Sequence, residues 1–196
     1  QLDYQDLWLI FTRRDIDIKK YPAILKYLKQ YKDQLTPGII GGRKPGSYEW
    51  YQIQDNTAYW QEFEKPKIVW GNLTLKPNFA FAESGFCVSA PANLIVSDSK
   101  YLLGILNSKI TEFWVAQSGA ERQGGFLEYK PMYVSPIPIP AQPEKEKISS
   151  LVTRILAAKL ANQQKDVSAL EQEIDQLVYM LYGLTQKEIA IVEGRE

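Results

Sequence analysis

The pattern of apolar and polar positions predicts short strands and helices in the first quarter of the chain. "LWLIFT", residues 7–12, is a short apolar run bounded by charged residues, which is typical of a buried strand. "YPAILKYLKQYKDQLTPG" then predicts a helix, because Pro22 stands in the first turn and Pro37 and Gly38 supply the stop. Alternation in "YEWYQIQ", residues 48–54, predicts a second strand.

The same pattern predicts more strands in the middle of the chain. "KPKIVWGNL", residues 65–73, reads as a strand, and "FCVSAPANLIVS", residues 86–97, reads as one or two strands with Pro91 at a turn. A last strand is expected over residues 126–134. The prolines that follow remove ladder donors and hold the chain extended, so the sheet should end there; they are Pro136, Pro138 and Pro140.

Helical spacing dominates the remaining segments. "KYLLGILNSKITEFWVAQ", residues 100–117, predicts a helix that is broken or kinked near Gly104 and near Asn107 and Ser108. After Pro143 the apolar positions follow helical spacing in two runs, and Gly183 ends the second run. Two capping boxes are expected, one from Ser168 to Glu171 and one from Thr185 to Glu188.

These elements together predict an α+β fold, with a mixed sheet of about six strands, flanking helices and a C-terminal antiparallel helical hairpin. We place a first domain at residues 1–142 and the hairpin, a possible spacer, at residues 143–196. The chain begins without a methionine, which suggests a part of a longer protein.

Composition narrows the function classes. A chain of 196 residues with 45% hydrophobic and 23% charged residues is ordinary for a soluble globular protein. "LWLIF" is far too short to span a bilayer, so we expect a cytoplasmic protein with no membrane partner. With no histidine and with Cys87 as the single cysteine, an internal disulfide, a zinc site and histidine-dependent catalysis are excluded within this chain.

Catalytic and cofactor motifs are absent from the sequence. There is no GxGxxG, no Walker loop and no Asn-Pro-Pro-Tyr or Asp-Pro-Pro-Tyr tetrapeptide, so we expect no catalytic residue, no metal and no cofactor in this chain. Glu128, Tyr129 and Lys130 supply half of a nuclease motif. In a chain with 23 acidic and 23 basic residues such a triplet arises by chance, so we favour ordinary exposed charges on a strand.

Charge and aromatic residues are unevenly distributed. The net charge is zero, yet lysine and arginine outnumber acids over residues 13–76, where aromatic residues also gather. Such a mixture can stack on bases and neutralise phosphates, but alternating aromatics also form the core face of a strand, and composition alone favours that second interpretation.

The order of the segments resembles the C-terminal specificity region of TaqI-like adenine-specific DNA methyltransferases, including those fused to a nuclease in restriction-modification enzymes. "YPAILKYLKQYKDQL", "WYQIQ", "KPKIVW" and "YLLGILNSK" carry the resemblance, which covers nearly the whole chain. The exit "IPIPAQPEKEKISSLVTRIL" is also similar to the start of the spacer helices in type I specificity subunits.

The resemblance implies a DNA target recognition domain. An N-terminal methyltransferase domain, absent from this chain, would bind S-adenosylmethionine and accept a flipped adenine from double-stranded DNA. Expected contacts lie in two loops and along the strands, and Arg122 is foremost among them. The candidate DNA-binding residues are Arg43, Lys44, Tyr48, Trp50, Gln52, Lys65, Lys67, Arg122, Gln123 and Lys130. The alternative is a protein interaction module that oligomerises through the C-terminal helices.

Overall fold

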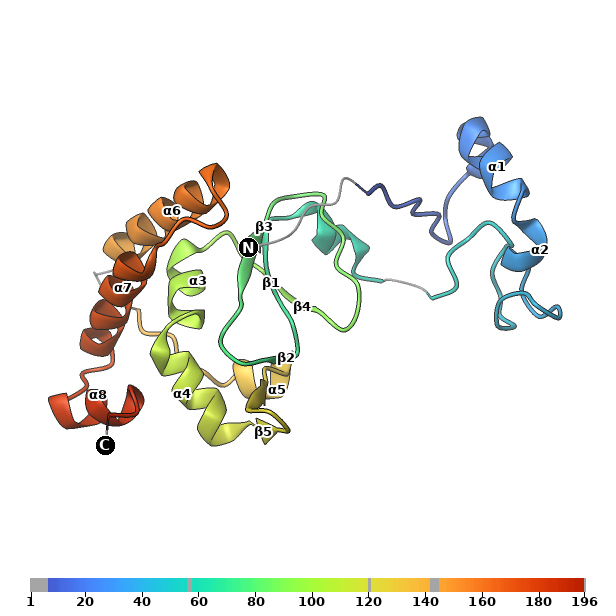
Figure 1. Ribbon diagram of the computed structural model, residues 1–196. Coiled ribbons are helices and arrows are strands. Elements are labelled where there is room, and N and C mark those ends of the chain that lie inside the picture. The colour runs from blue at the N-terminus through green and yellow to red at the C-terminus, as the bar shows by residue number, and fades with distance from the viewer. Residues whose placement is uncertain (1–6, 56–57, 120, 142–144, 196) are drawn as a thin grey trace. The chain divides into compact units, whose positions relative to one another are not determined.

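The computed structural model describes residues 7–55, 58–119, 121–141 and 145–195. The chain forms two compact units, which are residues 4–61, here called the N-terminal unit, and residues 62–196, here called the C-terminal unit. Helices and two small antiparallel sheets are both present, which confirms the predicted α+β class (Figure 1). None of the described helices is long and apolar enough to cross a membrane.

The N-terminal unit consists of short helices and irregular chain. A 3-10 helix η1 (Ile18–Lys20) precedes α1 (Pro22–Lys29), and α2 (Lys32–Leu35) follows after an interruption of the predicted helix. Another 3-10 helix, η2 (Trp60–Glu64), begins at the end of the unit. Among its described residues, Ile18 is the one buried apolar side chain, so the unit depends little on an apolar core.

Both strands predicted in the N-terminal unit are wrong. Residues 7–12 belong to no helix or strand, and Trp8 is 87% exposed. Residues 48–54 form turns and bends. A strand needs a partner ladder and a face to bury. Here the two segments meet through one main-chain hydrogen bond, from the N–H of Ile53 to the carbonyl of Thr12 at 2.8 Å, and through the Thr12 hydroxyl, which donates to the carbonyl of Tyr51. The apolar pattern alone was therefore misleading.

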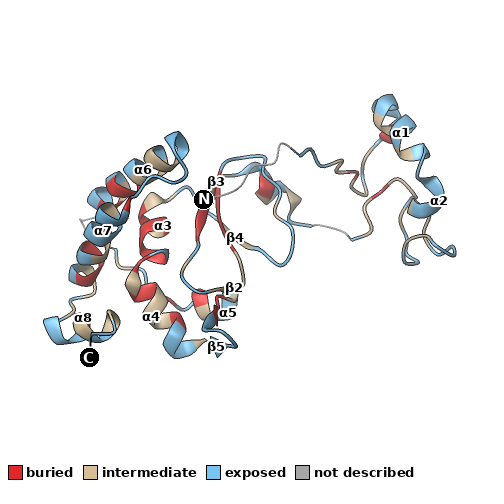
Figure 2. Cartoon of the chain, in the orientation of Figure 1, coloured by how far each residue is buried: buried red, intermediate tan, exposed pale blue. Residues whose placement is uncertain are grey.

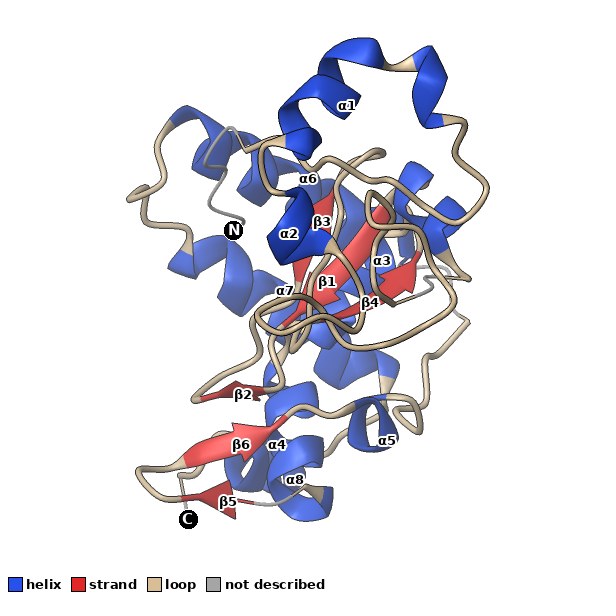
Figure 3. Ribbon diagram, turned by 90° about the vertical axis from the view of Figure 1, so that its right-hand side faces the viewer, coloured by secondary structure: helices blue, strands red, loops and turns tan. Residues whose placement is uncertain are grey.

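The C-terminal unit contains the first sheet, with strand order β3-β1-β4. Strand β1 (Lys67–Trp70) pairs antiparallel with β3 (Ala80–Ala82) and β4 (Asn93–Val96), and Ile68 stands opposite Phe81 and Ile95. The strand predicted over residues 65–73 is therefore confirmed for residues 67–70, and residues 86–97 contribute one strand after a turn at Pro91, as predicted. The sheet predicted as mixed is two separate antiparallel sheets (Figure 3).

The second sheet has the order β2-β6-β5. It consists of β2 (Leu73–Thr74), β6 (Phe126–Glu128) and β5 (Glu121–Arg122), all antiparallel. The last strand was predicted to continue to residue 134, which is wrong, because α5 (Pro131–Val134) follows directly. Pro131 has no N–H for a ladder and occupies the first helical position, where that donor is not needed.

Helices cover the first sheet in the C-terminal unit. Asn107 and Ser108 separate α3 (Lys100–Leu106) from α4 (Lys109–Ser118), as predicted. Helix α3 lies between the sheet and the hairpin of α6 (Lys145–Ala161) and α7 (Ser168–Leu181), after which α8 (Gln186–Val192) follows (Figure 1). The buried positions of these helices face one another (Figure 2). They include Leu103, Ile105, Ile148, Leu151, Ile174, Leu177 and Val178.

Three local predictions for these helices have different outcomes. Gly104 does not break α3; a Cβ there would lie 2.6 Å from Cγ2 of Ile148, so glycine allows α6 to approach. The capping box from Thr185 to Glu188 is confirmed. The box at Ser168 is wrong, because that residue is already helical and its N–H donates to the Asp166 carboxylate at 2.9 Å.

The hairpin belongs to the same compact unit as the sheets. Its apolar stripes are buried against α3 in one continuous core. The compact units therefore separate at residue 62, whereas the predicted division at residue 142 concerns function, with recognition before it and spacing after it. That functional division stays a prediction.

Candidate nucleic-acid interface

Arg43 holds the N-terminal unit together through main-chain carbonyl oxygens. Its Nε donates to Leu35 at 2.8 Å, its Nη1 to Gln52 at 2.7 Å and its Nη2 to Trp50 at 2.6 Å. Three donors of one guanidinium thus connect α2 to the turn at residues 50–52. The predicted contact loop at Arg43 and Lys44 therefore contains one structural cation and one exposed cation.

Arg14 has a similar structural role, which was not predicted from the sequence. Its guanidinium donates to the carbonyl of Ile53 and, at 2.6 Å, to that of Gln54. The guanidinium carbons of Arg14 and Arg43 lie 4.8 and 5.1 Å from the centroid of the Tyr48 ring. Tyr48 therefore already contacts two cations within the unit. Nothing in the spacing of the sequence identifies these partners.

Gln52, predicted to bond base edges, is buried in the N-terminal unit at 7% exposure. Its Nε2 donates to the carbonyl of Arg14 at 2.6 Å, and its Oε1 accepts the N–H of Glu49 at 3.0 Å. Both ends of the amide are thus occupied within the fold, and we leave Gln52 out of the contact surface proposed below.

Exposed cations and aromatic rings remain on the N-terminal unit, in and just after α1 and in the loop after α2. Lys26, Lys29 and Lys44 are exposed and form no ion pair with another described residue. Tyr27 and Tyr31 are partly exposed, with ring centroids 5.4 Å apart, and α1 contains no acidic residue. We call Lys26, Tyr27, Lys29, Tyr31 and Lys44 the basic surface. Of these, the predicted contacts included Lys44 alone.

Trp50, another predicted contact, is half-buried in the same unit. Its ring meets that of Tyr51 edge-on at 5.6 Å, and Nζ of Lys32 lies 5.8 Å from the Trp50 ring centroid. Its carbonyl accepts a hydrogen bond from Arg43 at 2.6 Å. Trp50 therefore contributes to both the framework and its surface.

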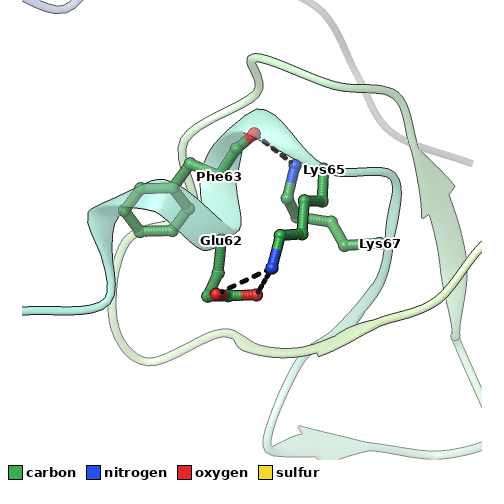
Figure 4. Close-up of polar contacts among 4 residues, drawn as sticks. All are labelled: Glu62, Phe63, Lys65 and Lys67. Atoms are coloured by element: carbon green, nitrogen blue, oxygen red, sulfur yellow. Dashed lines mark hydrogen bonds and ion pairs between the residues drawn. The ribbon is translucent and has the colours of Figure 1, made fainter.

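Lys65 and Lys67 have opposite surroundings (Figure 4). Lys65 is exposed and forms an ion pair with Glu62 at 2.9 Å. Lys67 is fully buried, and its Nζ donates to the carbonyls of Phe63 at 2.9 Å and Glu83 at 3.2 Å. Burial lowers the pKa of Lys67. Lys67 is therefore committed to the interior of the C-terminal unit.

The loop predicted at residues 122–125 is a β-hairpin turn. Arg122 pairs with Phe126 across the ladder, and the N–H of Gly125 donates to the carbonyl of Arg122 at 3.2 Å. Gly124 and Gly125 have φ of 84° and 78°, a region that other residues rarely adopt. The glycine pair thus forms a tight tip in which Gln123 is exposed.

Arg122, Glu128 and Lys130 form a charge cluster beside this turn. Nε of Arg122 donates to Oε1 of Glu128 at 2.7 Å, Nη2 of Arg122 forms an ion pair with the same oxygen at 2.6 Å, and Lys130 forms an ion pair with Oε2 at 2.8 Å. The hydrogen bonds from Lys130 and Arg122 lower the pKa of Glu128 despite its burial. Alternation along a strand places Glu128 and Lys130 on one side, but the partner Arg122 could not be read from the sequence.

The nuclease alternative receives no support from this cluster. Two cations occupy the Glu128 carboxylate, and the described residues contain no group of three or more metal-ligating side chains.

The chain belongs to the family of TaqI-like C-terminal specificity domains, whose model matches residues 8–139. The match spans both compact units. Among individual proteins, the chain is similar to the Type II methyltransferase M.PaeR7I of Pseudomonas aeruginosa, with 25% identity over 185 residues. The alignment covers 91% of this chain and 30% of that relative.

Proposed function

We propose that this chain is the DNA target recognition domain of an adenine-N6 methyltransferase. The family match over residues 8–139 carries the proposal, and the similarity to a Type II methyltransferase supports it. In the parent protein a separate domain would bind S-adenosylmethionine and perform methyl transfer, while this domain holds duplex DNA so that an adenine can be flipped out. Any nuclease activity of the parent protein would reside in a part of it outside this chain.

The proposed contacts divide into two groups. In the N-terminal unit, the basic surface contacts phosphates through its lysines, and Tyr27 and Tyr31 pack against the sugar-phosphate backbone. In the C-terminal unit, Arg122 and Gln123 at the hairpin contact bases. Three further cations of the same unit contact phosphates; they are Lys65, Lys76 and the partly exposed Lys130. Arg43, Gln52 and Lys67 maintain the framework that presents them.

Oligomerisation through the C-terminal helices has less support. That hypothesis requires the apolar stripes of α6 and α7 to be available to a partner. Leu151 and Leu177 on those stripes are 3% exposed within the chain's own core.

The proposal is tested by titrating a labelled duplex with the chain at low and at moderate salt. We expect weak binding at about 50 mM salt that falls steeply toward about 200 mM, since each phosphate contact adds about 0.9 to the slope of log affinity against log salt. No methyl transfer is expected from this chain. Absence of binding at the lower salt concentration would contradict the proposal.

Paired lysine substitutions locate the contact. Lys26→Ala with Lys29→Ala should weaken binding and reduce the salt slope by about 2. Lys147→Ala with Lys187→Ala removes the same charge from exposed positions on α6 and α8, and it should leave the slope unchanged. Equal effects of the two double variants would show that binding responds only to net charge.

A further inference from the structure

We propose that the β5–β6 ribbon enters the major groove of DNA and that Arg122 reads a guanine there, with Glu128 as its positioning residue. This inference rests on the proposed function. Beyond that function, guanine is the base recognised, and the Glu128 carboxylate orients the Arg122 side chain that binds it.

The guanidinium of Arg122 has two edges with different surroundings. The edge formed by Nε and Nη2 is fixed on Oε1 of Glu128, at 2.7 and 2.6 Å. Arginine carries five N–H donors. The outer edge of the guanidinium, formed by Nη1 and the second hydrogen of Nη2, can therefore donate two hydrogen bonds to a second pair of acceptors. The Arg122 side chain is 55% exposed. One edge is thus anchored, and the side chain as a whole is exposed enough for the other edge to meet an acceptor.

The anchor itself is held in place. The Glu128 side chain is 10% exposed, and its second oxygen contacts Lys130 at 2.8 Å. Strand β6 is the central strand of its sheet, where Glu128 pairs with Leu73 of β2. The carboxylate therefore cannot turn away without losing both cations. Arg122 consequently has a fixed direction before it meets DNA, which reduces the entropy lost on binding.

The size and shape of the element fit the major groove. That groove admits a two-stranded β-ribbon. Strand β2 pairs with β6 at Leu127 and Glu128, so the part beyond them, where Arg122 pairs with Phe126 and the glycine turn follows, is two-stranded and narrow. Gln123 at the tip and Phe126 beside it are exposed side chains that can contact neighbouring base edges and thymine methyl groups. Lys130, at the base of the ribbon, is 44% exposed and lies where a phosphate contact is expected.

Guanine is the base that matches the outward edge. In the major groove guanine presents two acceptors, N7 and O6, whereas adenine presents one acceptor and one donor. Arginine has donors and no acceptor, so two parallel hydrogen bonds form with guanine alone. A phosphate also accepts such a pair, and the experiment separates these two partners.

The experiment selects preferred duplexes for the full chain from a randomised library at low salt, and then measures affinity for the selected duplex and for each single base-pair change. The wild-type chain should select at least one fixed G·C pair. Arg122→Ala should lower affinity for the selected duplex on the order of 5- to 100-fold and abolish the preference at that one pair. Preferences at the other pairs should persist.

Two further variants test the positioning role. Arg122→Lys keeps the charge but lacks the fork, and it should lose the preference at the same pair. Glu128→Gln keeps an oxygen acceptor and removes the charge, so the preference should weaken at that pair and no other. Adding Glu128→Gln to Arg122→Ala should then have no further effect on discrimination. Lys76→Ala serves as the control, with a uniform loss across all sequences.

Each other outcome overturns the inference in a recognisable way. A uniform loss with Arg122→Ala would show a phosphate contact, and full discrimination by Arg122→Lys would exclude the guanine fork. Binding of the wild-type chain without any sequence preference would reject base reading and leave DNA binding intact. No binding at all would reject the proposed function and this inference with it.

Discussion

Arg43 and Lys44 are adjacent in the sequence but differ in what surrounds them. Arg43 donates to three main-chain carbonyls, whereas the Lys44 side chain is exposed. Arg43→Lys should destabilise the N-terminal unit by about 2–3 kcal/mol, because an ammonium cannot reproduce the planar fork. Hydrogen exchange of residues 7–55 would report the loss. Lys44→Ala should leave that exchange unchanged and weaken DNA binding, and the reverse pattern would contradict both assignments.

Gly104 is the second residue whose surroundings determine its effect. Alanine is favoured over glycine in a helix by about 1 kcal/mol, but here its Cβ would lie 2.6 Å from Ile148 and 3.1 Å from Val152. Both neighbours are buried and branched at Cβ, so overpacking outweighs propensity and Gly104→Ala should destabilise the chain by about 1–2 kcal/mol. Thermal melting measures this.

A rescue and a control make the Gly104 test specific. Ile148→Leu moves the branch away from Cβ, so Gly104→Ala combined with Ile148→Leu should recover part of the loss. Gly71→Ala meets its nearest atom at 3.6 Å, an ordinary contact, and should change stability by less than about 0.5 kcal/mol. If Gly104→Ala were neutral or stabilising, the close approach of α6 would not be limiting.

Sequence reasoning at the residue scale identified which kinds of side chain are present but not which of them are exposed. Arg43, Gln52 and Lys67 are predicted DNA contacts, and all three hydrogen-bond main-chain carbonyls of the framework. Long polar side chains can bond main-chain carbonyls within the fold or contact DNA at the surface equally well. Only the tertiary fold decides between carbonyl oxygens and solvent, so charge and type alone could not separate the two groups.

Helix α4 begins against a carboxylate of another helix. The N–H of Lys109 donates to Asp175 of α7 at 2.8 Å, although Ser108, the residue before α4, provides no side-chain cap. Burial raises the pKa of Asp175 to about 6; the bond from Lys109 opposes this shift, and Glu171 and Glu193 add to it. The folded chain therefore retains this proton to higher pH than the unfolded chain does.

The raised pKa of Asp175 determines the sign of a pH dependence. Between about pH 4 and pH 6 the folded state binds more protons here, so this group's stabilising contribution is full below pH 4 and is lost as pH rises through 6. Asp175→Asn keeps an oxygen acceptor without the charge. The melting temperature of Asp175→Asn should rise relative to that of the wild-type chain as pH increases from 4 to 7.

Asp166 provides a control of opposite sign. The N–H of Ser168 lowers the pKa of Asp166, so this carboxylate stabilises the fold above its unfolded pKa and loses that contribution on acidification. The melting temperature of Asp166→Asn should therefore decrease relative to that of the wild-type chain as pH increases. The same trend for both variants would mean that the measured change reflects net charge.

Helices and strands were predicted correctly where the signal lay within a few neighbouring residues. The break at Asn107 and Ser108 and the box at Thr185 are confirmed, because polar caps act within one turn. The strands at residues 7–12 and 48–54 failed, because a strand exists only with a partner that sequence alone does not supply. The β5–β6 hairpin lies between these cases, since its glycine turn was readable and its register was not.

The whole chain depends on its C-terminal helices for the core of the larger unit. Leu177→Ala should destabilise the C-terminal unit by about 2–5 kcal/mol, because a side chain 3% exposed leaves a cavity. Leu160→Ala on α6, at 84% exposure, is the matched control and should change stability by less than about 0.5 kcal/mol. Calorimetry with mass measurement in solution checks both variants. A change in oligomeric mass without a change in melting would favour the oligomerisation alternative.

The main-chain hydrogen bonds in the N-terminal unit also bear on how such a domain changes over evolution. Carbonyl groups are present whatever side chain a position carries, so Arg14 and Arg43 keep their acceptors when residues 35, 50, 53 and 54 are replaced. An apolar core, by contrast, restricts the volume of every side chain within it. A framework of this kind lets many side chains of the unit be replaced while its fold is kept.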